Sequence, residues 1–228
     1  MNKRATFMTV ALVILVGVGA ALYLKRGSAS KNILKPFEGL GTVAAQETAK
    51  LIAGQGQILL IVPDFGGMPN PAFDAQMTAF RNEIKRNSGI SIAATDTIKI
   101  GLSEGTKSKT LRFIEPTSRT RAPAGPQPGQ LGEMLRSYPQ AKAILYFVDL
   151  PEFNSADVDA LKQQGTKLVA ISDWRPNYKS LFQANLLQLS IVPRWQSYPE
   201  TGKKPRNMKD WFERSYEVVT VDNAGSVP

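Results

Sequence analysis

Hydrophobic residues along this chain follow two alternating patterns, short continuous runs and helically spaced positions. Two runs, Gln57–Val62 and Ala143–Val148, are apolar almost throughout, which is typical of strands covered on both faces. After the first run, apolar residues recur at helical spacing at Phe73, Met77 and Phe80. This alternation indicates strand–helix–strand units, whose right-handed crossovers produce a parallel sheet.

The same two patterns predict the remaining elements. Further strands are expected over Ile90–Ile100, Lys167–Ile171, Leu187–Val192 and Tyr216–Val221. Helices are expected over Val43–Ala53 after Thr42, from the N-cap Asn70 with Pro71 at the first helical position, around Leu131–Tyr138, from Asn154 to Gly165, and from Asn177. We therefore predict an α/β fold with a doubly wound, mostly parallel sheet in the flavodoxin-like order 2-1-3-4-5, plus a sixth strand at an edge.

The N-terminal segment Ala5–Leu24 carries no charge and is bracketed by Lys3-Arg4 and Lys25-Arg26. About twenty apolar residues in a helix span the hydrocarbon core of a membrane. A secretory signal peptide is the alternative, but its apolar region usually has only about 7–15 residues. We expect an uncleaved transmembrane helix and divide the chain into an anchor at 1–26, a linker at 27–41 and a single α/β domain at 42–228.

Composition narrows the chemistry. The chain has 228 residues, with 43% hydrophobic and 21% charged, which is ordinary for a folded domain. It contains no cysteine and no histidine. Thiol nucleophiles, thiolate metal sites and imidazole bases or ligands are therefore excluded, and we predict a protein that is not an enzyme and has no metal or cofactor.

The net charge of +9 suggests a nucleic-acid partner, but the positions of the basic residues do not support one. Four of the positive charges flank the apolar N-terminal segment. The remaining basic clusters, Arg112 with Arg119 and Arg121, and Lys203–Lys209, fall in loops without interleaved aromatic residues for stacking on bases. We expect no nucleic-acid partner.

From Ile58 onward, the chain resembles one lobe of the type I periplasmic binding proteins and the related sugar-responsive repressors. The similarity rests on Ile61-Val-Pro-Asp64, the helix entry Asn70-Pro71-Ala72-Phe73, and Ala143–Asp149 followed by Val158–Gly165 and Leu168–Asp173. The resemblance covers about 130 residues. It implies that the loop after the first strand and the ends of the third and fourth strands contact ligand, which here corresponds to Asp64, Asn70, Phe73, Asp149 and Asp173.

The topology predicts much the same site. In open α/β sheets, ligands bind outside the carboxyl ends of the strands where the strand order reverses, here between the first and third strands. Asp64, Gly66, Gly67 and Asn70 would meet Asp149 and Glu152 there. The alternative is purely structural: Asn70 as a helix cap, the glycines as a turn, and Asp149 as a loop acid.

Two other groups of residues invite weaker hypotheses. Asp64, Asp96, Asp149 and Asp173 could supply oxygen ligands to Mg²⁺, but strand-end acids are common in this fold class and no phosphate-binding loop accompanies them. Trp174, Trp195 and Trp211 could form a stacking surface for a sugar or a partner, or could simply pack against the domain.

The leading functional hypothesis is a membrane-anchored, non-catalytic accessory or scaffold subunit of a membrane or cell-envelope complex. The chain after Val192 is too short for the second lobe with which periplasmic binding proteins enclose their ligand. The alternative is a sensor or binding module for a small polar, sugar-like ligand, and a third hypothesis is a hydrolase or transferase that uses the strand-end acids. We expect a single-pass protein of the inner membrane with an extracytoplasmic domain, although positive residues flank both ends of the anchor.

Overall fold

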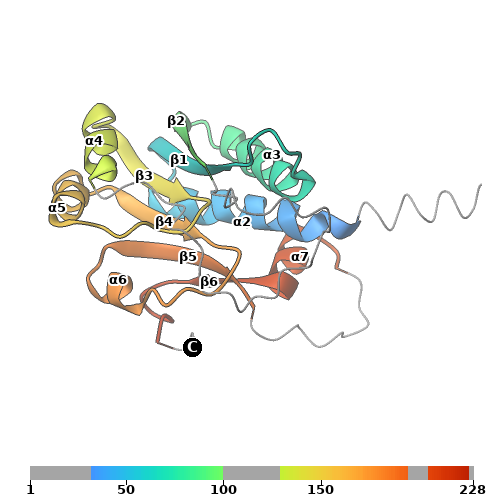
Figure 1. The fold of residues 1–228 in the computed structure, drawn as a ribbon. Helices are drawn as coiled ribbons and strands as arrows, with labels where there is room; N and C mark the ends of the chain where they lie inside the picture. The colour runs from blue at the N-terminus through green and yellow to red at the C-terminus, as the bar shows by residue number, and fades with distance from the viewer. Residues whose placement is uncertain (1–31, 100–128, 195–204, 226–228) are drawn as a thin grey trace, which may run out of the picture.

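A six-stranded sheet in the order β2-β1-β3-β4-β5-β6 forms the centre of the molecule (Figure 1). The structure is a computed structural model, and it describes residues 32–99, 129–194 and 205–225. The strands are β1 (Gly56–Asp64), β2 (Ile90–Lys99), β3 (Ala141–Tyr146), β4 (Lys167–Ile171), β5 (Leu187–Pro193) and β6 (Tyr216–Val219). All neighbouring pairs are parallel except β5 and β6, which are antiparallel. The predicted strand order and the sixth strand at the edge are confirmed.

Helices cover both faces of the sheet, as the doubly wound prediction requires. In chain order they are α2 (Lys35–Leu51), α3 (Pro71–Arg86), α4 (Gln130–Ser137), α5 (Ser155–Gln164), α6 (Lys179–Gln183) and α7 (Met208–Ser215). Side chains of α2, α3 and α7 share one hydrophobic core with one face of the sheet, and side chains of α4, α5 and α6 share a second core with the other face.

The two apolar runs in the sequence become the adjacent central strands β1 and β3. Leu59 pairs with Ile144 and Leu60 with Leu145 in parallel register, and all four side chains are at most 1% exposed. Such strands have no solvent-facing side, which explains why their sequence is continuous rather than alternating.

Most predicted helix ends are confirmed. The Asn70 Oδ1 atom accepts a hydrogen bond from the Phe73 N–H at 3.1 Å, so Asn70 is the N-cap of α3. Gly165 ends α5 with φ of +66°, a left-handed conformation that glycine adopts without steric cost.

The last strand is shorter than expected. Strand β6 stops at Val219 rather than Val221, because the Asn223 side chain accepts a hydrogen bond from the Thr220 N–H and turns the chain.

The first described helix starts earlier than expected. We placed its start after Thr42, but α2 begins at Lys35, so residues 35–41 of the expected linker are helical. Gly39 and Gly41 fall in this expected linker, yet both are buried at helix contacts. A Cβ atom on Gly39 would lie 2.7 Å from the Met208 carbonyl oxygen, and one on Gly41 would lie 2.0 Å from that of Gln76. These glycines let α2 approach the backbones of α7 and α3.

The expected anchor and most of the segment between β2 and α4, which the sequence predicts to be a long loop from Gly101 to Gly129, lie outside the part of the chain that the structure describes. This applies to Ala5–Leu24 and to all of residues 101–129 except Gly129. Among the helices of the described residues, none combines the length and the apolar character needed to cross a membrane. The division into anchor and extracytoplasmic domain therefore stays a prediction.

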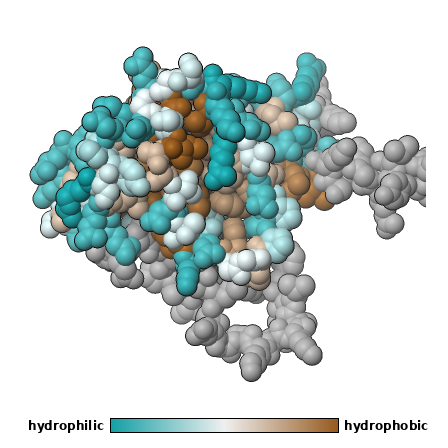
Figure 2. All heavy atoms as spheres, turned by 90° about the horizontal axis from the view of Figure 1, so that it is seen from above, coloured by the Kyte–Doolittle hydropathy of each residue, from teal (hydrophilic) through white to brown (hydrophobic). Residues whose placement is uncertain are grey.

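The edge strand β2 is the most polar strand of the sheet. All of its residues except Ile90 are exposed or half-buried, whereas β1 next to it is mostly buried. Figure 2 looks onto the molecule from above, the side on which β2 lies in Figure 1, and shows a hydrophobic strip in a mostly hydrophilic face. The more polar sequence of this strand is therefore that of an edge position.

Because Gly41 touches backbone, we predict that Gly41→Ala destabilises the domain by about 1–3 kcal/mol, which lowers the melting temperature by about 3–10 °C. The clash is with the carbonyl oxygen of Gln76, which cannot move without shifting α3. Thermal unfolding followed by circular dichroism measures the effect.

The matched control is Gly225→Ala, since nothing lies within 4 Å of the atom that this substitution adds. It should leave the melting temperature within about 1 °C of the parent chain. Equal melting temperatures for the two variants would show that α2 and α3 are not in backbone contact.

Candidate functional site

All seven predicted site residues lie at one end of the sheet, where the parallel strands finish. We call this end the carboxyl edge and define it by the loops 64–70, 147–154 and 172–178 together with the first residues of α3. Since β1, β3 and β4 are adjacent and parallel, their carboxyl ends meet there. The predicted residues on this edge are Asp64, Gly66, Gly67, Asn70, Phe73, Asp149 and Asp173.

The loop between β1 and α3 is shaped by its own polar side chains. The Asp64 Oδ1 atom accepts from the Gly66 N–H at 2.8 Å, and Asn70 is committed to the cap of α3. Gly66 and Gly67 have φ of +64° and +80° and no atom near their missing side chains, so the turn is open to solvent. The structural interpretation of Asn70 and the two glycines is thus correct, and it leaves the backbone of this turn accessible.

Phe73 connects this loop to the end of β3. Its ring packs edge-on against Phe65 at 5.4 Å and against Phe147 at 6.3 Å between ring centroids, and Phe147 in turn packs against Phe80 at 5.4 Å. The resemblance implied that Phe73 contacts ligand. In this chain two sides of the ring are already engaged in positioning the loop over the core.

Asp149 and Trp174 join the loops that follow β3 and β4. The Trp174 Nε1–H donates to the Asp149 Oδ1 atom at 2.5 Å, and the Ser172 hydroxyl lies 3.5 Å from the same oxygen. Trp174 is nevertheless 48% exposed, one of few large apolar side chains that the described residues leave in solvent. The hydrogen bond fixes an aromatic ring and a carboxylate side by side on the carboxyl edge.

Half-buried Tyr178 and buried Tyr216 lie close enough to acidic side chains for their pKa values to change. The pKa of Tyr178 lies well above its ordinary value, mainly because the side chain is withdrawn from water and secondly because Asp149 is negatively charged. Burial, and then the charge of Asp173, raises the pKa of Tyr216 to about 12. Asp149 therefore disfavours ionisation of Tyr178 in the loop after β4, and Asp173 disfavours ionisation of Tyr216 at the start of β6.

Asp157 occupies the anion-binding position at the N-termini of two helices. It is 1% exposed, and its carboxylate accepts three backbone N–H groups, from Gly129 at 2.8 Å, Gly132 at 3.0 Å and Asn154 at 3.2 Å. Helix N-termini attract anions through these unpaired N–H groups and the helix dipole. At the N-termini of α4 and α5, the Asp157 carboxylate occupies the position that a bound anion would take.

Sequence reasoning missed the roles of Asp157 and Trp174. For Asp157 a signal was available, because an acid three residues after the N-cap Asn154 is the spacing of a capping box, which the structure contains. The link to Gly129 and Gly132 depends on how α4 and α5 pack, and no local pattern encodes it. Trp174 was considered only as one of several tryptophans, without Asp149 as its partner.

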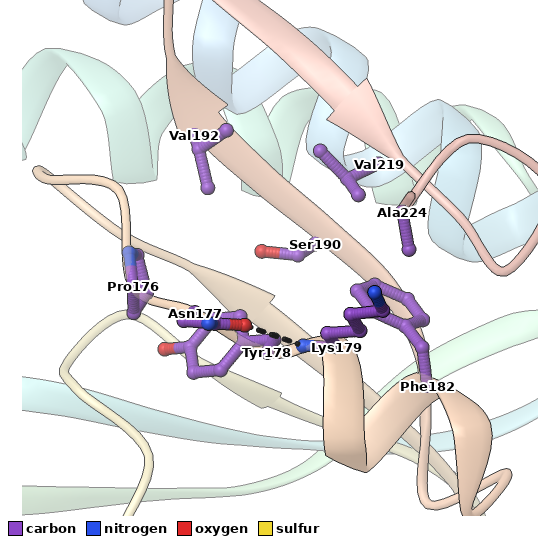
Figure 3. A pocket seen from close by; sticks show the side chains of 9 residues that line it. All are labelled: Pro176, Asn177, Tyr178, Lys179, Phe182, Ser190, Val192, Val219 and Ala224. Atoms are coloured by element: carbon purple, nitrogen blue, oxygen red, sulfur yellow. Dashed lines mark hydrogen bonds between the residues drawn. The ribbon is translucent and has the colours of Figure 1, made fainter. Parts of the chain in front are cut away.

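Two hollows lie in the described part of the chain, and none of the seven predicted site residues lines either of them. One, of about 20 Å³, lies between the strand β5 and residues 176–179. Figure 3 shows the Ser190 hydroxyl inside this hollow, and no described residue hydrogen-bonds to it. The volume suits about one water molecule. The other, of about 170 Å³, lies at the opposite end of the strands, near Gly165 and Gln188. Neither hollow encloses the predicted site residues, and among the described residues of the carboxyl edge Gly66, Gly67 and Trp174 are open to solvent.

The described residues provide no candidate Mg²⁺ site. Within residues 32–99, 129–194 and 205–225, no group of three or more acidic side chains is close enough to hold a metal ion.

Comparisons with solved structures identify similar folds. An arabinose-binding protein, AraP from Geobacillus stearothermophilus, matches with a TM-score of 0.51 and 15% identity over 84% of this chain and 63% of that one. A sugar-binding protein of a sugar ABC transporter from Bacillus halodurans matches with a TM-score of 0.50 and 13% identity over 84% of this chain and 64% of that one. The chain thus spans less than two thirds of the length of either protein.

The resemblance to the type I periplasmic binding proteins is confirmed at the level of the fold. No protein-family model matches the sequence. No curated protein matches it either.

We predict that Asp157→Asn destabilises the domain by about 2–3 kcal/mol, because a carboxamide places an N–H₂ group against backbone N–H donors that now share a carboxylate. Urea unfolding measures the change. Asp159→Asn, on the exposed face of the same helix, should change the free energy of unfolding by less than about 0.5 kcal/mol. If the two variants unfold at the same urea concentration, the carboxylate does not hold α4 and α5 together.

Proposed function

We propose that this protein binds a small, uncharged, sugar-like ligand at the carboxyl edge and does not transform it chemically. The observation that carries the proposal is the pair formed by Trp174 and Asp149: an exposed aromatic ring whose N–H is fixed on a carboxylate, at the end of two adjacent strands. A ring face packs against the apolar side of a pyranose or furanose, and carboxylate oxygens accept hydrogen bonds from hydroxyl groups.

The charges on the edge favour an uncharged ligand over an anion. Asp64, Asp149 and Asp173 are acidic, and each lies at or just beyond the end of a strand. The N-termini of α4 and α5 already hold Asp157, and the first turn of α3 carries Asp74. A phosphate or carboxylate ligand would meet repulsion here, whereas a polyol would meet hydrogen-bond acceptors.

The fold supports the same class of ligand. Both similar structures described above are named as sugar-binding proteins, and the site predicted here falls where open α/β sheets bind ligands. This favours the sensor hypothesis over the scaffold hypothesis that the sequence alone suggested first. The proposed residues are Trp174 and Asp149 as the principal contacts, with Asp64 and the backbone of Gly66 and Gly67 at the rim.

The open shape of the edge sets an expectation for affinity. Ligand pockets usually bury most of the ligand surface, and a ligand on a single open edge keeps part of its surface in water. We therefore expect weak, rapidly reversible binding, which suits a sensor of ligand concentration rather than a scavenger.

Binding should be visible as thermal stabilisation. At a ligand concentration of about 100 times Kd, mass action adds about 2.7 kcal/mol to the stability of the folded state. Differential scanning fluorimetry against a panel of neutral sugars and polyols, beginning with arabinose, should show at least one that raises the melting temperature by several degrees.

Two variants at Trp174 separate the contributions of the ring and its N–H. Trp174→Ala and Asp149→Asn should abolish the stabilisation, and Trp174→Phe should retain part of it because the ring remains. Asp159→Asn, an exposed acid on α5, should respond to ligand like the parent chain. A panel in which no sugar or polyol stabilises the parent chain, or in which Trp174→Ala responds fully, would refute the proposal.

The proposal places the binding module at the inner membrane, anchored through Ala5–Leu24 with the domain on the extracytoplasmic side. An accessory role in an envelope complex, as first expected, would then require a protein partner in addition to the ligand. The anchor lies outside the residues that the structure describes, so the anchor and the partner belong to the proposal and not to the fold.

Sidedness can be tested directly because the chain has no cysteine. A Gln163→Cys variant of the full chain should react with a membrane-impermeant maleimide in intact cells, since Gln163 is exposed on α5. A Lys3→Cys variant should react only after lysis. The reverse pattern would place the domain in the cytoplasm.

A further inference from the structure

The N-terminus of α2 lies at the carboxyl edge of the sheet. Helix α3 follows β1, so α3 begins at this edge with Pro71 and runs toward the other edge. Gly41 packs against Gln76, and the Gln46 Nε2 atom donates to Glu83 at 3.0 Å, so α2 runs parallel to α3. Lys35, six residues before Gly41, is therefore at the level of the start of α3. Figure 1 shows α2 and α3 side by side.

The chain that precedes α2 is short. Residues 25–34 separate the expected anchor Ala5–Leu24 from Lys35. Ten residues reach at most about 36 Å when fully extended and less when they are helical. The carboxyl edge is thus the end of the domain from which the chain leads to the membrane, and it cannot be far from the bilayer surface.

Exposed hydrophobic side chains gather at the same end. Large apolar side chains that stay exposed in the described part of the chain are Ile33 at 68%, Met68 at 53%, Trp174 at 48% and Val221 at 64%. Ile33 directly precedes α2, Met68 lies in the loop between β1 and α3, and Trp174 follows β4. Three of the four are therefore at the carboxyl edge, and Val221 lies beyond the end of β6.

We propose that the carboxyl edge faces the bilayer and that Ile33 and Met68 dip into its headgroup region. The inference rests on the anchor that the proposed function includes. Aliphatic, methionine and tryptophan side chains partition favourably into the membrane interface, and the tether supplies a high local concentration that makes a small contact sufficient. The ligand site beside Trp174 then opens toward the membrane surface, so the module binds polyhydroxylated ligands there.

Site-directed spin labelling tests this orientation in the full-length chain. Met68→Cys and Gln163→Cys place a nitroxide on the carboxyl edge and on the opposite end of α5, and the parent chain has no cysteine to interfere. The proteins are reconstituted in vesicles of phosphatidylcholine, whose zero net charge avoids repulsion of the acidic carboxyl edge. Collision of the label with lipid-soluble oxygen is compared with collision with a water-soluble nickel complex.

The expected result is an oxygen-to-nickel collision ratio several-fold higher at position 68 than at position 163. Adding Ile33→Asp to the Met68→Cys chain should lower that ratio toward the value at 163. Equal ratios at the two positions, or a higher ratio at 163, would overturn the inference, as would a chain that does not sediment with the vesicles.

A sugar titration of the same vesicles, followed by tryptophan fluorescence, keeps this inference distinct from the ligand proposal. A high ratio at position 68 without any sugar response supports the orientation while refuting the ligand. A sugar response with equal ratios at both positions supports the ligand while refuting the orientation.

Discussion

Burial of β1 and β3 between two helical layers is the constraint on which the other features depend. Their side chains reach the surface on neither face, so both strands must lie in the middle of the sheet and both faces must be covered. Helices joining parallel strands run back from the carboxyl end, which places the loops after β1, β3 and β4 together. The same geometry brings the starts of α2 and α3 to that end, held there by the backbone contact at Gly41. The location of the candidate site is thus a consequence of core packing.

At the carboxyl edge, some polar side chains hydrogen-bond to the backbone and others remain available to a ligand. Asn70 and Asp157 are used to cap helices, and Asp64 shapes its own turn. What remains available is a half-exposed tryptophan on a carboxylate, an accessible glycine turn, and a predominantly negative field. That inventory suits hydroxyl-rich, uncharged ligands better than anions, and the ligand proposal rests on it.

Sequence patterns predicted the fold well because its signals are local. Continuous apolar runs, the Asn70-Pro71 helix start and the stop at Gly165 each encode their element within a few residues, and strand order follows from the handedness of the crossovers. The start of α2 was missed since Gly39 and Gly41 look like linker residues unless their neighbours on α3 and α7 are known. The pairing of Trp174 with Asp149 joins residues 25 positions apart, and the link from Asp157 to Gly129 spans 28. Neither has a local signature, so the sequence predicts the end of the sheet at which these residues lie but not the contacts between them.

The central claim is that Trp174 meets an uncharged ligand at the carboxyl edge. The indole N–H signals of the tryptophans are few and separate in a two-dimensional proton–nitrogen NMR spectrum, and Trp174→Phe assigns the relevant one. On titration with a neutral sugar that the domain binds, the account predicts that the Trp174 signal moves progressively, because the ligand alters its hydrogen bond to Asp149. A Trp174 signal that stays fixed while signals elsewhere in the domain move would contradict it.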